Sequence, residues 1–201
     1  MPELINLFPT PISIENDLPF DNDKLKDYCF SLQKKFPKGN GQIRSNAAGW
    51  QSHYLKFREK IEVKFGQLIL HRVNSFAERI GLKYPLRLQN MWININGYKD
   101  FNWPHTHANA QLSGVYYVHA KKDMGNIVFE HPKQSDVEHD WITGINTKVP
   151  VDITTANSWW FPSETKSLIL FPSWAIHRVN PSFNKKESRV SISFNCGTED
   201  D

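Results

Sequence analysis

The chain changes its hydrophobic period once, near Pro85, and this change limits the folds that it can adopt. Before Pro85, apolar residues recur at intervals of three and four, which is the period of an amphipathic α-helix. After Pro85, short runs of alternating apolar and polar residues are separated by glycine and proline, as in strands joined by turns. Helices followed by many short strands predict helices packed on a β-sandwich or barrel, and not a central parallel sheet.

Two helices are expected before Pro85. Asp21 can cap a short helix over about residues 23–35, because its side chain can accept a hydrogen bond from a free backbone N–H of the first turn. A longer amphipathic helix is expected over about 53–80, and Gly81 can end it as the C′ residue. These helices would support the strands that follow.

Seven strand-like runs are expected in the rest of the chain. They lie near residues 86–95, 111–119, 126–130, 147–153, 167–171, 176–180 and 188–195. We expect a single domain over residues 1–201, with a helical support region over 1–84 and a strand core over 85–196. The connection over 131–146 is long and polar, and connections of that length are often functional lids.

The last of these runs separates its side chains into a polar and an apolar set. On a strand, Arg189, Ser191, Ser193 and Asn195 fall on one face, and Val190, Ile192, Phe194 and Cys196 fall on the other. Since strands usually bury their apolar face, the polar face must point to water or into a polar pocket. The position of an arginine just after His177 favours the pocket.

Three histidines are the candidate metal ligands. His105 and His107 are spaced i, i+2, so on a strand their side chains point to the same side. His177, from a distant strand, can complete a three-point face on one metal ion, which leaves the opposite face open for a substrate or dioxygen. Imidazole binds iron, zinc, copper and nickel alike, so the ligands alone do not select the metal.

An arginine near these histidines suggests iron and 2-oxoglutarate. This cosubstrate chelates iron through its keto and C1 carboxylate oxygens, and its far carboxylate needs a buried cation with hydroxyl neighbours. Arg189 offers a bidentate guanidinium, and Ser191 on the same strand face adds a hydroxyl. Strand alternation sends only one of Tyr116 and Tyr117 inward, and we favour Tyr117. Asn94 completes the expected cofactor-binding set, and no catalytic residue is expected beyond the metal ligands.

Charge and composition exclude several classes of function. The net charge is +3, and no basic run marks a nucleic-acid footprint. No apolar run approaches the ~18–20 residues that span a membrane, and the N-terminus lacks the basic and apolar regions of a signal peptide. Cys29 and Cys196 lie in no metal-type spacing, so we expect reduced, partly buried thiols. A cytoplasmic protein (in the host cytoplasm if viral) without nucleic-acid or membrane partners is expected.

Six segments, in order along the chain, carry a resemblance to a known family. They are residues 45–52, 105–107, 112–118, 125–129, 170–179 and 189–195. The chain is similar there to the 2-oxoglutarate/Fe(II)-dependent oxygenases found often in marine bacteria and their phages, and more distantly to prolyl and aspartyl/asparaginyl hydroxylases. The resemblance implies a mainly β fold, the double-stranded β-helix or jelly-roll, with Fe(II) in its mouth and with 2-oxoglutarate and O2 as cosubstrates.

The chain departs from the usual pattern of such oxygenases at one metal ligand. Most carry His-x-Asp or His-x-Glu, whereas here the carboxylate position holds His107. Three neutral ligands would leave Fe(II) with a higher net charge than two histidines and one carboxylate do. Alternatively, His105 and His177 bind the metal alone and water fills the third position. A further alternative is a ligand pair shifted by two residues along the chain, in which His107 is the histidine and Asn109 takes the carboxylate position.

Three functional hypotheses follow. The main one is a dioxygenase that hydroxylates a protein side chain (Pro or Asn/Asp) or a small molecule. The second is a cupin-type metalloenzyme that does not use 2-oxoglutarate, since Gln111 after His105 and His107 loosely matches cupin ligand spacing and Arg189 could be structural or bind an acidic substrate. The third is a non-catalytic binding domain on the same fold. Conversion of 2-oxoglutarate to succinate with and without Fe(II) separates the first hypothesis from the others.

Overall fold

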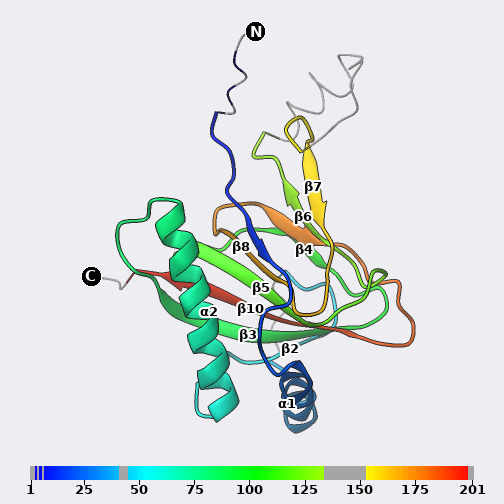
Figure 1. Cartoon of the computed structure of the whole chain (residues 1–201). Helices are drawn as coiled ribbons and strands as arrows, with labels where there is room; N and C mark the ends of the chain where they lie inside the picture. Colours follow the sequence, from blue (N-terminus) through cyan, green and yellow to red (C-terminus); the bar gives the residue numbers. More distant parts are fainter. Residues whose placement is uncertain (1–2, 4, 6, 41–44, 134–152, 199–201) are drawn as a thin grey trace.

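Two antiparallel sheets form the body of the molecule. The computed structural model describes residues 3, 5, 7–40, 45–133 and 153–198 (Figure 1). The larger sheet consists, in spatial order, of β1 (Ser13–Glu15), β8 (Leu168–Pro172), β5 (Leu112–His119), β10 (Arg189–Gly197), β3 (Arg87–Asn96) and β2 (Trp50–Gln51). The smaller sheet consists of β4 (Asn102–His105), β9 (His177–Val179), β6 (Ile127–Glu130) and β7 (Ser158–Phe161). The expected fold class, a mainly β jelly-roll, is confirmed.

Two helices pack on one face of the larger sheet, as expected. They are α1 (Asn22–Lys35) and α2 (Lys60–Arg79), and Figure 1 shows α2 lying across β3, β10 and β5. The shared core includes Leu25 and Cys29 of α1, Phe65, Ile69, Val73 and Phe76 of α2, and Met91, Ile93, Ile192 and Phe194 of the strands. Each fully buried side chain of this size contributes about 1.5–3 kcal/mol relative to an exposed one.

Capping residues fix two of the helix ends where the sequence predicts them. The Asp21 carboxylate accepts a hydrogen bond from a backbone N–H of the first turn of α1. Gly81 follows α2 with φ +81°, and its N–H donates to the carbonyl of Glu78 (3.0 Å). Glycine adopts this left-handed conformation without the steric penalty that a side chain brings, so it ends the helix.

The predicted start of α2 is wrong. The helix begins at Lys60 rather than near residue 53. The Glu62 carboxylate accepts hydrogen bonds from the backbone N–H groups of Arg58 and Glu59, and this capping box sets the first turn. Such boxes usually begin with Ser or Thr, so a glutamate in that place gives a weak sequence signal. Neither described helix is both long enough and apolar enough to cross a membrane.

Most predicted strand runs correspond to strands of the structure. Six of the seven match β3, β5, β6, β8, β9 and β10. The seventh, near 147–153, lies almost wholly outside the described residues, as does most of the 131–146 connection proposed as a lid. The seven runs leave out β1, β2, β4 and β7. Two residues in β2 cannot establish a two-residue period, and the Ser-Trp-Trp-Phe of β7 does not alternate apolar and polar residues.

Apolar and polar side chains lie on opposite faces of β10, as its sequence predicts. Val190, Ile192 and Phe194 are buried in the core beneath the helices. Arg189 and Ser191 line a pocket on the opposite face, and residues of both sheets contribute to its walls. Because β10 pairs with β3 on one side and β5 on the other, its polar side chains are held in the middle of the larger sheet.

Candidate active site

The three candidate ligand histidines come together at the pocket. His105 ends β4 and His177 begins β9, and these two residues are opposite partners in the antiparallel pair. His107 lies two residues beyond β4, where its backbone N–H donates to the carbonyl of Ser173 (2.9 Å). One ring nitrogen from each histidine lies within 4.8 Å of the others. The i, i+2 pair and the distant histidine therefore meet, as predicted.

Backbone hydrogen bonds orient two of the rings. Nδ1 of His105 lies 2.7 Å from the carbonyl oxygen of Trp103, and Nδ1 of His177 lies 2.9 Å from that of Ala175. A carbonyl oxygen can only accept, so each Nδ1 must carry the proton. Each Nε2 then keeps its lone pair, which is the arrangement found in histidines that bind metals.

Burial keeps the histidine cluster neutral. It lowers the pKa of His177 to about 3 and that of His107 to about 4, and the nearby His105 adds to both effects. Burial also lowers the pKa of His105. Uncharged imidazoles at neutral pH can bind a cation without first losing a proton. Within the described residues, the cluster contains no Asp or Glu.

Two alternative ligands suggested by the sequence do not join this cluster. Asn109 is exposed, and its carbonyl accepts a hydrogen bond from the side chain of Gln89 (2.9 Å). The side chain of Gln111 accepts a hydrogen bond from the backbone N–H of Thr198 (3.0 Å). Neither residue lines the pocket, so the geometry does not favour the shifted frame or the cupin-like spacing.

Arg189 places a buried positive charge in the same pocket. Its side chain is 2% exposed, and Nη1 donates hydrogen bonds to the backbone carbonyls of Met124 and Gly125. Burial lowers the pKa of the guanidinium, whereas the neighbouring Tyr117 and Asp100 act in the opposite direction. No carboxylate among the described residues lies within ion-pair distance of Arg189. An isolated buried charge is costly, so this site favours an anion.

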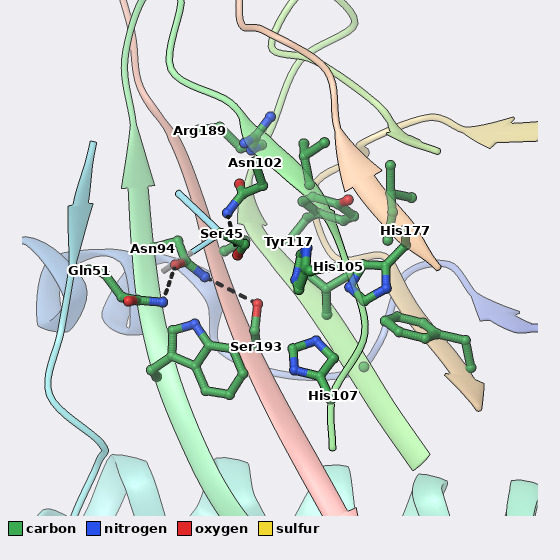
Figure 2. Close-up of a pocket in the computed structure, with 17 residues that line it drawn as sticks. Ser45, Gln51, Asn94, Asn102, His105, His107, Tyr117, His177, Arg189 and Ser193 are labelled. Carbon is green, nitrogen blue, oxygen red and sulfur yellow. Dashed lines mark hydrogen bonds between the residues drawn. The ribbon is translucent and has the colours of Figure 1, made fainter. Parts of the chain in front are cut away.

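The other expected cofactor-binding residues line the pocket with Arg189 (Figure 2). They are Ser191, Tyr117 and Asn94. Strand alternation directs Tyr116 to the opposite face, where its hydroxyl donates to the side chain of Asn22 (2.7 Å). The choice of Tyr117 over Tyr116 as the inward tyrosine therefore agrees with the structure.

Several lining residues were not singled out from the sequence. Gln51, Trp92, Ser45 and Asn102 also form the pocket, as does Ser193, which the sequence places on the polar face of the last strand. Trp92 could have been found from strand alternation, because it is two residues from Asn94 on β3. Ser45 and Gln51 lie within a segment that carries the family resemblance, but nothing in their spacing indicates that the chain there returns to the pocket.

The comparison with protein families identifies the chain. Residues 90–195, more than half of it, match the family described as "Putative 2OG-Fe(II) oxygenase". The chain belongs to this family of 2OG-Fe(II) oxygenases. It is therefore an Fe(II)- and 2-oxoglutarate-dependent oxygenase, and the matched region contains all three histidines and Arg189.

Solved structures show the same fold over nearly the whole of this oxygenase. A Pseudomonas putida prolyl-4-hydroxylase is 11% identical, with a TM-score of 0.64, and the match covers 96% of each chain. A prolyl hydroxylase from Trichoplax adhaerens, in complex with a hypoxia inducible factor peptide fragment, is 14% identical, with a TM-score of 0.61 over 92% of this chain and 83% of that one.

A third similar structure is viral. The collagen prolyl hydroxylase of Paramecium bursaria chlorella virus 1, in its 2-oxoglutarate complex, is 8% identical with a TM-score of 0.60, and the match covers 93% of this chain and 96% of that one. At such low identity these likenesses establish the fold, and residue roles must be argued from the site itself. A search of curated proteins finds no match.

Proposed function

We propose that this oxygenase binds Fe(II) through His105, His107 and His177, binds 2-oxoglutarate through Arg189, and hydroxylates a protein side chain or a small molecule. One observation carries the proposal. A single pocket contains three neutral imidazoles within 4.8 Å of one another and a buried guanidinium with no ion-paired carboxylate among the described residues.

The donor set fits an iron ion. Nε2 of His105 and of His177 is available because Nδ1 of each ring is held by a backbone carbonyl. Neither ring nitrogen of His107 has a hydrogen-bond partner among the described residues, so this ring is free to be the third ligand. Three neutral ligands leave the full charge of +2 on Fe(II), and the C1 carboxylate of 2-oxoglutarate would offset part of it.

The polar wall beside the histidines fits the dianion. Arg189 would hold its far carboxylate, since a guanidinium presents parallel N–H donors to a carboxylate. Ser191 and Tyr117 would add hydroxyl donors, and burial raises the pKa of Tyr117 so that its proton is retained. Asn94 lies beside Ser191 across the β3–β10 pair and would border the same site.

The bound iron and 2-oxoglutarate supply the chemistry, which couples oxidation of a substrate C–H bond by O2 to the conversion of 2-oxoglutarate into succinate and CO2. The chain's own residues hold and enclose these groups. Arg189 fixes one end of the dianion, and the histidines fix the metal at the other. Val115, Ile127, Phe171 and Val179 form apolar parts of the pocket wall and limit the access of water.

A peptide is the substrate class that we favour. The similar structures include three prolyl hydroxylases, one of them in complex with a peptide fragment. A proline, asparagine or aspartate side chain of a protein is therefore our first candidate, and a small molecule with comparable groups is the second.

The test is turnover of 2-oxoglutarate to succinate with and without Fe(II). We expect succinate only when Fe(II), O2 and 2-oxoglutarate are all present, and we expect anaerobic Fe(II) with 2-oxoglutarate to give a metal-to-ligand charge-transfer band. The variant His177→Ala should lose both signals, whereas His71→Ala, on α2, should keep them. Metal binding without a band or succinate would instead support a metalloenzyme that does not use 2-oxoglutarate.

A further inference from the structure

The pocket has a polar wall on the side opposite the metal-ligand cluster. Gln51, Asn94 and Ser193 form this wall, which we call the amide wall, and Figure 2 shows it across the pocket from His105 and His177. Gln51 comes from β2, Asn94 from β3 and Ser193 from β10, so three adjacent strands build it. Gln51 and Ser193 have no role in the proposed binding of iron or 2-oxoglutarate.

A chain of hydrogen bonds fixes the amide wall. The side chain of Asn40 donates to Gln51 Oε1 (2.8 Å), and Gln51 Nε2 donates to Asn94 Oδ1 (3.2 Å). Asn94 Nδ2 then donates to Ser193 Oγ (3.1 Å). Because each link joins the next, the orientations of the two amides are coupled, and neither can turn without breaking the chain.

The chain leaves both donors and acceptors for an occupant of the pocket. A primary amide has two N–H groups and an oxygen with two lone pairs, and each amide of the wall uses one N–H and one lone pair in the chain. The Ser193 hydroxyl accepts from Asn94, and its own hydrogen has no hydrogen-bond partner among the described residues. Alternating donors and acceptors complement another amide, which has both in the same arrangement.

Charge argues for a neutral occupant. The amide wall contains no ionisable side chain, so neither a carboxylate nor an ammonium group would find an opposite charge there. The positive charges of the pocket, Arg189 and the proposed iron, would repel a cation. A carboxylate group would be drawn towards those charges and away from the wall, where burying it would be costly.

An aromatic ring links the wall to the metal-ligand cluster. Trp92 lines the pocket next to Asn94 on β3, and its ring centroid lies 5.9 Å from that of His107 and 6.0 Å from that of Tyr54. Its flat apolar surface can pack against the plane of an amide held by the wall. A group bound there would face the metal-ligand cluster across the pocket.

We propose that the amide wall is the prime-substrate subsite and that it selects a neutral amide, either of a peptide backbone or of an Asn or Gln side chain. This proposal rests on the proposed function. Gln51 is its main specificity residue, because Asn94 also borders the 2-oxoglutarate site and Ser193 shares β10 with Arg189. Gln51 lies on β2, a strand with no proposed 2-oxoglutarate residue.

Three blocked amino acids test the proposal: N-acetyl-asparagine N-methylamide and its aspartate and alanine analogues. Each is titrated anaerobically into protein loaded with Fe(II) and 2-oxoglutarate, following the shift of the charge-transfer band. Recognition of a side-chain amide predicts that the asparagine probe binds about tenfold more tightly than the others. Recognition of backbone amides predicts similar affinities for all three probes. In either case Gln51→Leu should weaken binding of the preferred probes about tenfold and leave 2-oxoglutarate affinity unchanged.

Two further variants complete the design. Gln67→Leu makes the same change at an exposed position of α2 and should behave as the wild type. Ser193→Ala removes only a hydroxyl and tests the wall independently if Gln51→Leu does not fold. Tighter binding of the aspartate probe, equal affinities in wild type and both wall variants, or no binding of any probe would overturn the proposal. Ligand-observed NMR measures binding of the same probes without the charge-transfer band. Probe binding without a band would therefore count against the proposed function and not against the amide wall.

Discussion

Replacing Arg189 by lysine should weaken 2-oxoglutarate binding by about 10- to 150-fold. Arg189 is 2% exposed, and its Nη1 already donates to the carbonyls of Met124 and Gly125. Its other N–H groups are left for a carboxylate. A lysine ammonium carries its three donors on one atom, so it cannot hold these backbone carbonyls and also present two parallel N–H groups to the ligand carboxylate. One lost charge-assisted hydrogen bond costs about 1.5–3 kcal/mol, from which the expected range follows.

The measurement is an anaerobic titration of 2-oxoglutarate into Fe(II)-loaded protein, following the charge-transfer band. Thermal or chemical unfolding gives an independent value. At 2-oxoglutarate 100 times the wild-type Kd, the wild type should gain about 2.7 kcal/mol of stability, whereas a variant with 30-fold weaker binding should gain about 0.9 kcal/mol. Metal affinity should change little, since Arg189 does not belong to the histidine cluster.

Arg178→Lys is the matched control. Arg178 lies on β9 next to His177, but its Nε donates to Glu130 (3.1 Å) and it does not line the pocket. We expect wild-type affinity for 2-oxoglutarate in this variant. The reasoning is refuted if Arg189→Lys binds 2-oxoglutarate as tightly as the wild type, or if both arginine variants lose affinity equally.

Three other predictions concern the metal, the packing and the thiols. His107→Ala should weaken metal binding by more than the roughly 10- to 100-fold that outer partners of a ligand usually cost, whereas His107→Asp should retain the metal; competition with a chelator measures both, and an unchanged Kd in the alanine variant would remove His107 from the ligand set. Gly114→Ala should destabilise the fold by about 1–3 kcal/mol in urea unfolding, because the new Cβ would lie 2.7 Å from a ring carbon of Phe194; wild-type stability would contradict that packing. Burial raises the pKa of Cys196 to about 12 and also raises that of Cys29, so few thiolates exist at pH 8 and a thiol reagent should react with neither until the protein unfolds; rapid reaction of the native protein would oppose this.

The sequence predicts the site best where a regular period constrains the side chains. Alternation along one strand places Arg189 and Ser191 together, and the i, i+2 rule places His105 and His107 on one side. Both predictions need only local geometry. The meeting of His177 with His105 is long-range, and the family resemblance supports it where periodicity cannot.

Predictions fail where short elements or unusual caps determine the structure. The two-residue strand β2 brings Gln51 into the pocket, yet two residues show no period. The start of α2 depends on Glu62 bonding back to Arg58 and Glu59, and the helical pattern extends past that point. The pairing of β2 with β3 is a tertiary contact that the local sequence does not encode, whereas the capping box is local but begins with a glutamate instead of the usual Ser or Thr.

The two proposed binding sets belong to different sheets. The histidines lie on or beside β4 and β9 of the smaller sheet, whereas Arg189, Ser191, Tyr117 and Asn94 belong to the larger one. Aromatic packing joins the two layers there, with the rings of Phe129 and Phe171 5.0 Å apart and that of Phe171 4.6 Å from His177. A cosubstrate that contacts both sets would connect the two sheets. Substitutions of Phe129 or Phe171 can therefore change the distance between the metal site and Arg189 while both sheets stay intact.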